Sequence, residues 1–185
     1  MGIGTERSLD DDIEWFSLDD IEERGTDRYV ARALAALRAD PLWLPDDTIR
    51  VLLVDLDNLR VQPSRLRGRI AMAVALAREA DLACFAGQDG AVRRALPWLE
   101  EYADTAVEVG RDHNEADLAL LDAAARVAND DVQFIVLSND GIFARLATRG
   151  PLLVLSPGAA SLSDELADAA DRVVDIQQIE AGVTA

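Results

Sequence analysis

From Ile49 onward, short apolar runs alternate with segments of helical character, and this alternation constrains the fold more than any other feature of the sequence. The run IRVLLV is β-branched and almost wholly apolar, as expected for a strand buried on both faces. Strands that alternate with helices predict a three-layer α/β/α sandwich with a mainly parallel, Rossmann-like sheet. The predicted strands span residues 49–54, 82–85, 106–109, 132–137, 152–155 and 173–176.

The predicted helices lie between these strands and ahead of them. Those of the sheet region span residues 63–79, 91–102 with a kink at Pro97, 115–128, 141–148 and 162–169. In the acidic N-terminal segment, one helix is predicted to begin near Leu18, to be interrupted at Gly25, and to be followed by a second helix from Thr26 to Ala39. We therefore expect a helical appendage and linker over 1–48, a main domain over 49–176 and a tail over 177–185.

The amino-acid composition excludes several kinds of binding site and catalytic mechanism. All 18 basic residues are arginine, so a Walker-type phosphate loop and a Schiff-base lysine are excluded. Cys84 and His113 are the only residues of their types, which excludes a Cys₂His₂ zinc site and an internal disulfide. The 35 Asp and Glu residues supply carboxylates, the ligands that suit Mg²⁺ or Mn²⁺. A net charge of −17 disfavours a protein that binds nucleic acid through bulk electrostatics alone.

No apolar run is long enough to span a membrane. The acidic N-terminus is also unlike the basic start of a signal peptide. The sequence therefore predicts a soluble, cytoplasmic protein that makes no membrane contact.

Three carboxylates fall where a parallel α/β sheet places its ligand site, beyond the carboxyl ends of the strands. Asp55 ends the first predicted strand, Asp140 follows the fourth, and Asp117 lies in the first turn of a helix. Leu120, Leu121 and Ala124 share one helical face with Asp117. That apolar face must pack on the sheet, so Asp117 is expected to point towards the strand ends.

Each of these acids also has a purely structural interpretation. Asn114 and Asp117 are spaced like a capping box, Asp140 is positioned to cap the helix after it, and Asp55 and Asn58 suit Asx turns. Converging carboxylates, however, repel one another unless a cation lies between them. Their joint position therefore favours a divalent metal site.

The segments around these acids, VDLDNL, HNEADLALLDAA and FIVLSNDGIFARL, occur in the order found in one nuclease family. With the closing ADRVVDI, the sequence from Ile49 to Ile176 resembles the PIN-like nucleases, particularly the NYN-type branch. The resemblance implies a PIN-like sheet and a metal-dependent ribonuclease that hydrolyses RNA with Mg²⁺ or Mn²⁺.

The resemblance also assigns roles to residues. Asp55, Asp117 and Asp140 would be the catalytic metal ligands and Asp57 a further acid, although a strand-like register would point Asp57 away from Asp55. Asn58, Ser138, Asn114 and His113 would contact the substrate or support the acids. Two positions depart from the family pattern: Ile142 stands where many members have a second acid, and His113 stands in place of a lysine.

Arginines follow the first acidic strand end. Arg60, Arg65, Arg67 and Arg69 are expected beside the mouth of the site, where guanidinium groups suit RNA phosphates. The alternative is that they form a solvated helix face paired with acids of the N-terminal segment.

Two other functions stay open. A PIN-like domain with a degraded site would act as an RNA- or protein-binding regulatory module, in line with Ile142 and the high negative charge. A haloacid-dehalogenase-like phosphatase would explain DLDNL and FIVLSND, but needs further charged residues that are not evident. The N-terminal helices could mediate oligomerisation or contact a protein partner. Trp15, Phe16 and Trp43 are expected to pack in the core rather than anchor an interface.

Overall fold

The computed structural model describes residues 18–44, 47–59, 61, 63–110, 112, 114–127 and 131–181. For residues 18–25, 63 and 64 it describes the backbone alone. Its centre is a six-stranded sheet in which every pairing is parallel. The strands are β1 (Ile49–Asp55), β2 (Leu82–Gln88), β3 (Val107–Val109), β4 (Val132–Leu137), β5 (Leu152–Ser156) and β6 (Arg172–Asp175). The predicted α/β fold with a parallel sheet is confirmed.

The strand order β3-β2-β1-β4-β5-β6 creates a switch point in the middle of the sheet. The chain moves outward from β1 to β3, then returns to lay β4 against the other side of β1. Val54 of β1 is in register with Phe85 of β2 and with Leu137 of β4. The residues that follow these three strands therefore emerge side by side, at the place where α/β proteins bind ligands.

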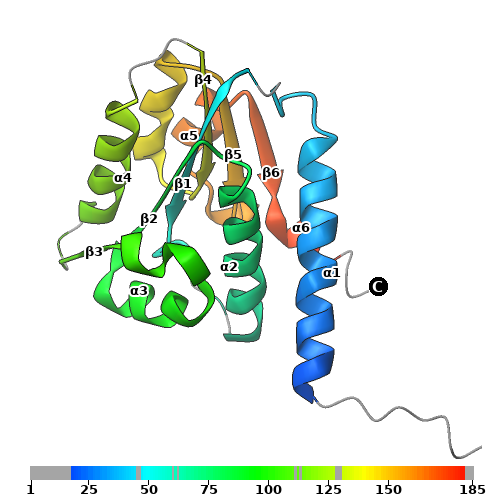
Figure 1. The fold of residues 1–185 in the computed structure, drawn as a ribbon. Coiled ribbons are helices and arrows are strands. Elements are labelled where there is room, and N and C mark those ends of the chain that lie inside the picture. The colour runs from blue at the N-terminus through cyan, green and yellow to red at the C-terminus, as the bar shows by residue number, and fades with distance from the viewer. Residues whose placement is uncertain are drawn as a thin grey trace, which may run out of the picture.

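Helices cover both faces of this sheet, as Figure 1 shows. On one face the core includes side chains from α1 (Leu18–Arg38), α2 (Pro63–Ala77), α3 (Asp89–Ala95) and α6 (Ile176–Ala181). On the other face it includes α4 (Glu115–Ala125), the 3₁₀ helix η3 (Gly141–Thr148) and α5 (Asp164–Ala169). Leu52 and Val54 of β1 face the first core, and Val51 and Leu53 face the second. This alternation directs Asp55 towards the α4 side.

The helix α1 is continuous from Leu18 to Arg38, so the predicted break at Gly25 is wrong. A glycine inside a helix costs about 1 kcal/mol relative to alanine. Burial of an apolar stripe at a four-residue spacing outweighs this cost: Tyr29, Ala33 and Leu37 are all buried in the first core. None of the helices in the described ranges is long and apolar enough to cross a membrane.

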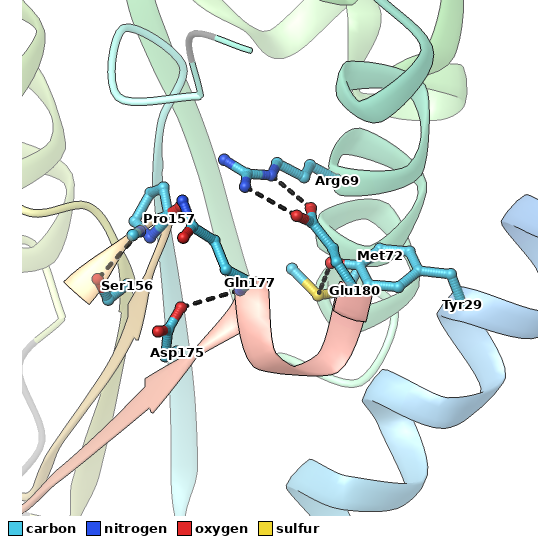
Figure 2. Close-up of polar contacts among 9 residues, drawn as sticks. Tyr29, Arg69, Met72, Ser156, Pro157, Asp175, Gln177 and Glu180 are labelled. Atoms are coloured by element: carbon cyan, nitrogen blue, oxygen red, sulfur yellow. Dashed lines mark hydrogen bonds and ion pairs between the residues drawn. The ribbon is translucent and has the colours of Figure 1, made fainter. Parts of the chain in front are cut away.

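Long-range polar contacts hold α6 and α1 against α2, as Figure 2 shows. The guanidinium of Arg69, in α2, donates to Glu180 of α6 from Nε at 2.6 Å and from Nη2 at 3.1 Å. Tyr29 of α1 donates its hydroxyl hydrogen to the sulfur of Met72 at 3.4 Å. Gln177 reaches from α6 to the carbonyl oxygen of Pro157, beyond the end of β5.

One helical prediction needs correction in detail. The segment around Pro97 is not one kinked helix: α3 ends at Ala95, and the 3₁₀ helices η1 (Leu96–Trp98) and η2 (Glu100–Thr105) follow it. The predicted short helix over 141–148 is present and is of the 3₁₀ type. Trp43 is half-buried against the first core and lies 4.9 Å from the guanidinium of Arg50, whereas Trp15 and Phe16 lie outside the described residues.

Candidate functional site

A cavity of about 360 Å³ opens at the carboxyl ends of β1, β2 and β4, under the N-terminus of α4. We call it the acidic cavity, because its described lining contains acidic side chains and no basic one. The acids are Asp55, Asp57, Asp112, Glu115, Asp117 and Asp140. The structure thus brings together the four acids singled out from the sequence, and adds Asp112 and Glu115, which the sequence did not single out.

Asp55 is buried at the end of β1 and is held from several sides. Its Oδ1 accepts hydrogen bonds from the backbone N–H of Asp57 at 3.0 Å and of Asn58 at 3.4 Å, which confirms the Asx turn. Its Oδ2 accepts from the Asn58 side-chain amide and from the Ser138 hydroxyl. Burial raises the pKa of Asp55, while the hydrogen bonds from Asn58 and Ser138 oppose the rise.

Ser138 connects the ends of β1 and β4. It is fully buried, donates its hydroxyl hydrogen to Asp55 Oδ2 at 2.9 Å, and accepts from the backbone N–H of Asp140 at 3.1 Å. Asp140 in turn caps η3, because its Oδ1 accepts from the N–H of Ile142 at 2.9 Å. The structural roles considered for Asp55 and Asp140 are therefore both real, yet both side chains also line the acidic cavity.

Asp117 has no comparable structural role. Its side chain is 7% exposed, lines the acidic cavity, and accepts no hydrogen bond from the described residues. The pKa of Asp117 is raised to about 7, first because burial removes the carboxylate from water. The negative charges of Asp55, Asp140 and Asp57 raise it further, in that order.

The capping box considered for Asn114 and Asp117 is wrong. Asn114 is the N-cap of α4, but its side chain makes no capping hydrogen bond. Its backbone has φ 69° and ψ 8°, a left-handed conformation that costs energy for a residue other than glycine. A box needs an extended N-cap, and this backbone conformation prevents it.

Amide side chains complete the lining of the acidic cavity, from Asn58, Gln88 and Asn114. The expectation that Asp57 points away from Asp55 is wrong, because side chains two residues apart share a face even in an extended strand, and here the backbone N–H of Asp57 also turns back to Asp55 Oδ1. Asp57 faces the cavity, and its Oδ2 accepts from the backbone N–H of Gln88 at 2.9 Å. The sequence did not single out Gln88, because only the pairing of β2 with β1 brings this residue to the acidic cavity.

Beside this site, Asn139 carries a buried network that the sequence did not reveal. It donates to the carbonyl oxygen of Gly158 at 3.1 Å and to Ser161 Oγ at 2.6 Å, and it accepts from the Ser156 hydroxyl at 2.7 Å. These bonds fix the loop after β5 against the end of β4. Because Asn139 lies between Ser138 and Asp140, its hydrogen bonds also fix the backbone of these two residues.

The donor chemistry of the acidic cavity fits a hard divalent cation. Within the described ranges, no three carboxylate, thiol or imidazole groups are arranged to hold a metal ion as they stand. The buried carboxylate of Asp117, which no described donor satisfies, nevertheless faces the same cavity as Asp55, Asp57 and Asp140. Carboxylate oxygens are the ligands of Mg²⁺ and Mn²⁺, so binding requires side-chain reorientation but no different residue.

The predicted arginine track is not found as expected. Arg69 is 1% exposed and paired with Glu180, so the expectation that it contacts phosphate at the mouth is wrong. Arg65 is exposed and Arg67 half-buried, and neither lines the acidic cavity. Arg60 and His113 lie outside the described residues.

Fold and site together define an α/β protein with an all-parallel sheet and a carboxylate-lined cavity at its switch point. The sequence matches no protein-family model and no curated protein. Among solved structures it is similar to a protein of unknown function from Vibrio parahaemolyticus, with 18% sequence identity and a TM-score of 0.46. That match covers 71% of this chain and 94% of the other.

Proposed function

We propose that the protein is a metal-dependent ribonuclease of the PIN-like, NYN-type kind, which uses Mg²⁺ or Mn²⁺ in the acidic cavity to hydrolyse RNA phosphodiester bonds. One observation carries the proposal. Asp117 is buried without a hydrogen-bond donor among the described residues, in the cavity that Asp55 and Asp140 also line. A carboxylate in that position is unfavourable unless a cation or a proton neutralises it, and the raised pKa has the same cause.

Asp55, Asp117 and Asp140 would hold the metal, with Asp57 at the same cavity as a further ligand. When bound, the ion lowers the pKa of a coordinated water and stabilises negative charge that develops on the phosphate. Ser138 keeps the Asp55 carboxylate oriented through its 2.9 Å hydrogen bond. Asn58, Gln88 and Asn114 provide amide N–H donors that can orient the phosphate and ribose oxygens.

A regulatory module without catalysis is the second candidate, and a specific observation favours it. The described lining of the acidic cavity carries no basic side chain to attract phosphate, and Ile142 stands beside Asp140 in place of a further acid. The same lack of a basic partner disfavours a haloacid-dehalogenase-like phosphatase.

Purified protein incubated with single-stranded and structured RNA, in Mn²⁺ or Mg²⁺, tests the proposal. We expect cleavage by the wild type, loss of cleavage in Asp55→Asn and Asp140→Asn, and retention in Asp122→Asn, an exposed acid on α4. Circular dichroism of each variant verifies folding. RNA binding without cleavage would favour the module, and hydrolysis of small phosphomonoesters instead would favour the phosphatase.

A further inference from the structure

A second concave surface adjoins the acidic cavity. It is an open groove of about 780 Å³ between α4, η3 and α5, lined by Asn114, Ile142, Ala144, Arg145, Glu165, Asp168 and Ala169. We call it the Arg145 groove. Asn114 lines both spaces, and Asp140 in the cavity accepts a hydrogen bond from Ile142 in the groove. A ligand that fills the cavity can therefore extend into the groove.

Packing fixes the walls of this groove. Phe143 and Leu146 of η3 and Leu166 of α5 are buried in the second core, so η3 and α5 pack against each other. A Cβ added to Gly141 would lie 2.7 Å from Ser163 Oγ and 3.2 Å from Glu165 Oε2. Glycine at 141 thus lets α5 come close, and it brings the Glu165 carboxylate next to the residue that follows Asp140.

The lining combines three chemistries. Arg145 is exposed and forms no ion pair within the part of the chain that the structure describes, although two acids share its groove. Ile142, Ala144 and Ala169 offer a small apolar wall. Glu165 and Asp168 offer carboxylates, which accept hydrogen bonds but cannot donate them when ionised.

We propose that the Arg145 groove binds one nucleotide unit of RNA next to the linkage in the acidic cavity, with preference for a base that carries an exocyclic amino group. This rests on the proposed function. Arg145 contacts the phosphate, since a guanidinium matches phosphate geometry. The apolar wall packs against the base, and Glu165 or Asp168 accepts from its amino group, as carboxylates accept from cytosine N4. Uracil presents a carbonyl oxygen there, which a carboxylate repels.

Binding of labelled single-stranded C5 and U5 RNA, followed by fluorescence anisotropy in Ca²⁺, tests this inference. The two oligonucleotides have the same ring size and backbone and differ only at ring positions 3 and 4, where cytosine has an acceptor and the amino group and uracil has an N–H and a carbonyl oxygen. We expect C5 to bind several-fold more tightly than U5. Arg145→Gln should weaken binding of both by roughly three- to tenfold at an unchanged C5-to-U5 ratio. Glu165→Gln with Asp168→Asn should bring the ratio close to one. Arg126→Gln, at an exposed arginine that caps the C-terminal end of α4 and lines neither space, should change neither value.

Equal binding of C5 and U5 by the wild type, or unchanged binding in Arg145→Gln, would overturn the inference, as would no RNA binding at all. A parallel incubation with Mn²⁺ separates it from the proposed function. Arg145-dependent binding without cleavage supports the groove and contradicts the ribonuclease. Cleavage that is indifferent to Arg145 and to base identity supports the ribonuclease and contradicts the groove.

Discussion

The hydroxyl of Ser138 donates a hydrogen bond to Asp55 Oδ2 at 2.9 Å, and so joins the ends of the two strands between which the sheet order switches. The same oxygen of Ser138 accepts from the backbone N–H of Asp140. One fully buried side chain thus sets the positions of two of the acids to which we assign metal binding.

Replacing Ser138 tests this link. Ser138→Ala leaves Asp55 with one donor fewer and the N–H of Asp140 without its acceptor, so we expect a loss of about 1–3 kcal/mol in the free energy of unfolding. Urea denaturation measures the loss. Thr105→Ala, which removes an exposed hydroxyl, is the matched control and should change stability little. Equal stability of Ser138→Ala and the wild type would show that the link is not stabilising.

Asp117 should make the metal-free protein less stable as the pH rises. Its folded-state pKa of about 7 lies above the ordinary value of 3.8, so the folded chain holds this proton more tightly than the unfolded chain. The resulting stabilisation is fully present below about pH 3.8 and is lost as the pH rises through about 7. In EDTA at pH 8, Asp117→Asn should therefore melt at least several degrees above the wild type.

The difference between the two melting temperatures should grow from pH 4 to pH 7 and stay constant above it. Differential scanning calorimetry at several pH values follows it. A constant difference across this range would contradict the assignment of the raised pKa to Asp117.

Metal affinity should follow the same titration. A proton and a cation compete for Asp117, so the apparent Mn²⁺ affinity should rise by up to about tenfold per pH unit below pH 7 and level off above it. Calorimetric titrations at pH 6, 7 and 8 measure this dependence. Affinity that is flat from pH 6 to pH 7 would exclude Asp117 from the ligands.

The buried ion pair between Arg69 and Glu180 should matter for stability mainly because removing one partner leaves the other charge buried and unpaired. Glu180→Gln leaves the Arg69 guanidinium, 1% exposed, without its counter-charge, and we expect a loss of about 2–4 kcal/mol. The double variant Arg69→Met with Glu180→Met should lose less, because it leaves no buried charge. Breaking the exposed pair by Arg38→Gln is the control and should have little effect. A double variant that is less stable than Glu180→Gln would contradict this explanation.

The helix α1 should be an integral part of the folded core. Leu37→Ala removes a side chain that is 1% exposed, and we expect a loss of about 2–4 kcal/mol. Leu118→Ala, at a leucine that is 48% exposed, should stay within about 0.5 kcal/mol of the wild type. Equal effects of the two substitutions in thermal denaturation would show that α1 is only loosely attached.

The fold could be predicted from the sequence because local patterns carry it. A run such as IRVLLV suits a strand covered on both faces, and Leu120, Leu121 and Ala124 put Asp117 on the buried face of its helix. The direction of side chains beyond a strand end and the continuity of α1 were harder to predict than the fold. The direction expected for Asp57 was wrong because side chains two positions apart in a strand share a face, and Gly25 was judged by its helix propensity without the buried stripe that outweighs it.

Contacts between distant segments were the least predictable. Arg69 was assigned to the mouth of the site by its place in the sequence, yet its partner Glu180 lies 111 positions away. Gln88 enters the acidic cavity through strand pairing, and Arg145 reaches its groove through the packing of η3 on α5. No periodicity or local spacing encodes these approaches.

Calorimetric titration of Mn²⁺ into the wild type, Asp117→Asn and Asp122→Asn at pH 8 tests the metal site most directly. Asp117 and Asp122 lie on the same helix, but the first is buried in the acidic cavity and the second is exposed. We predict saturable binding by the wild type and by Asp122→Asn, and loss of that binding in Asp117→Asn. No uptake of Mn²⁺ by the wild type, or equal affinity in Asp117→Asn, would contradict this prediction.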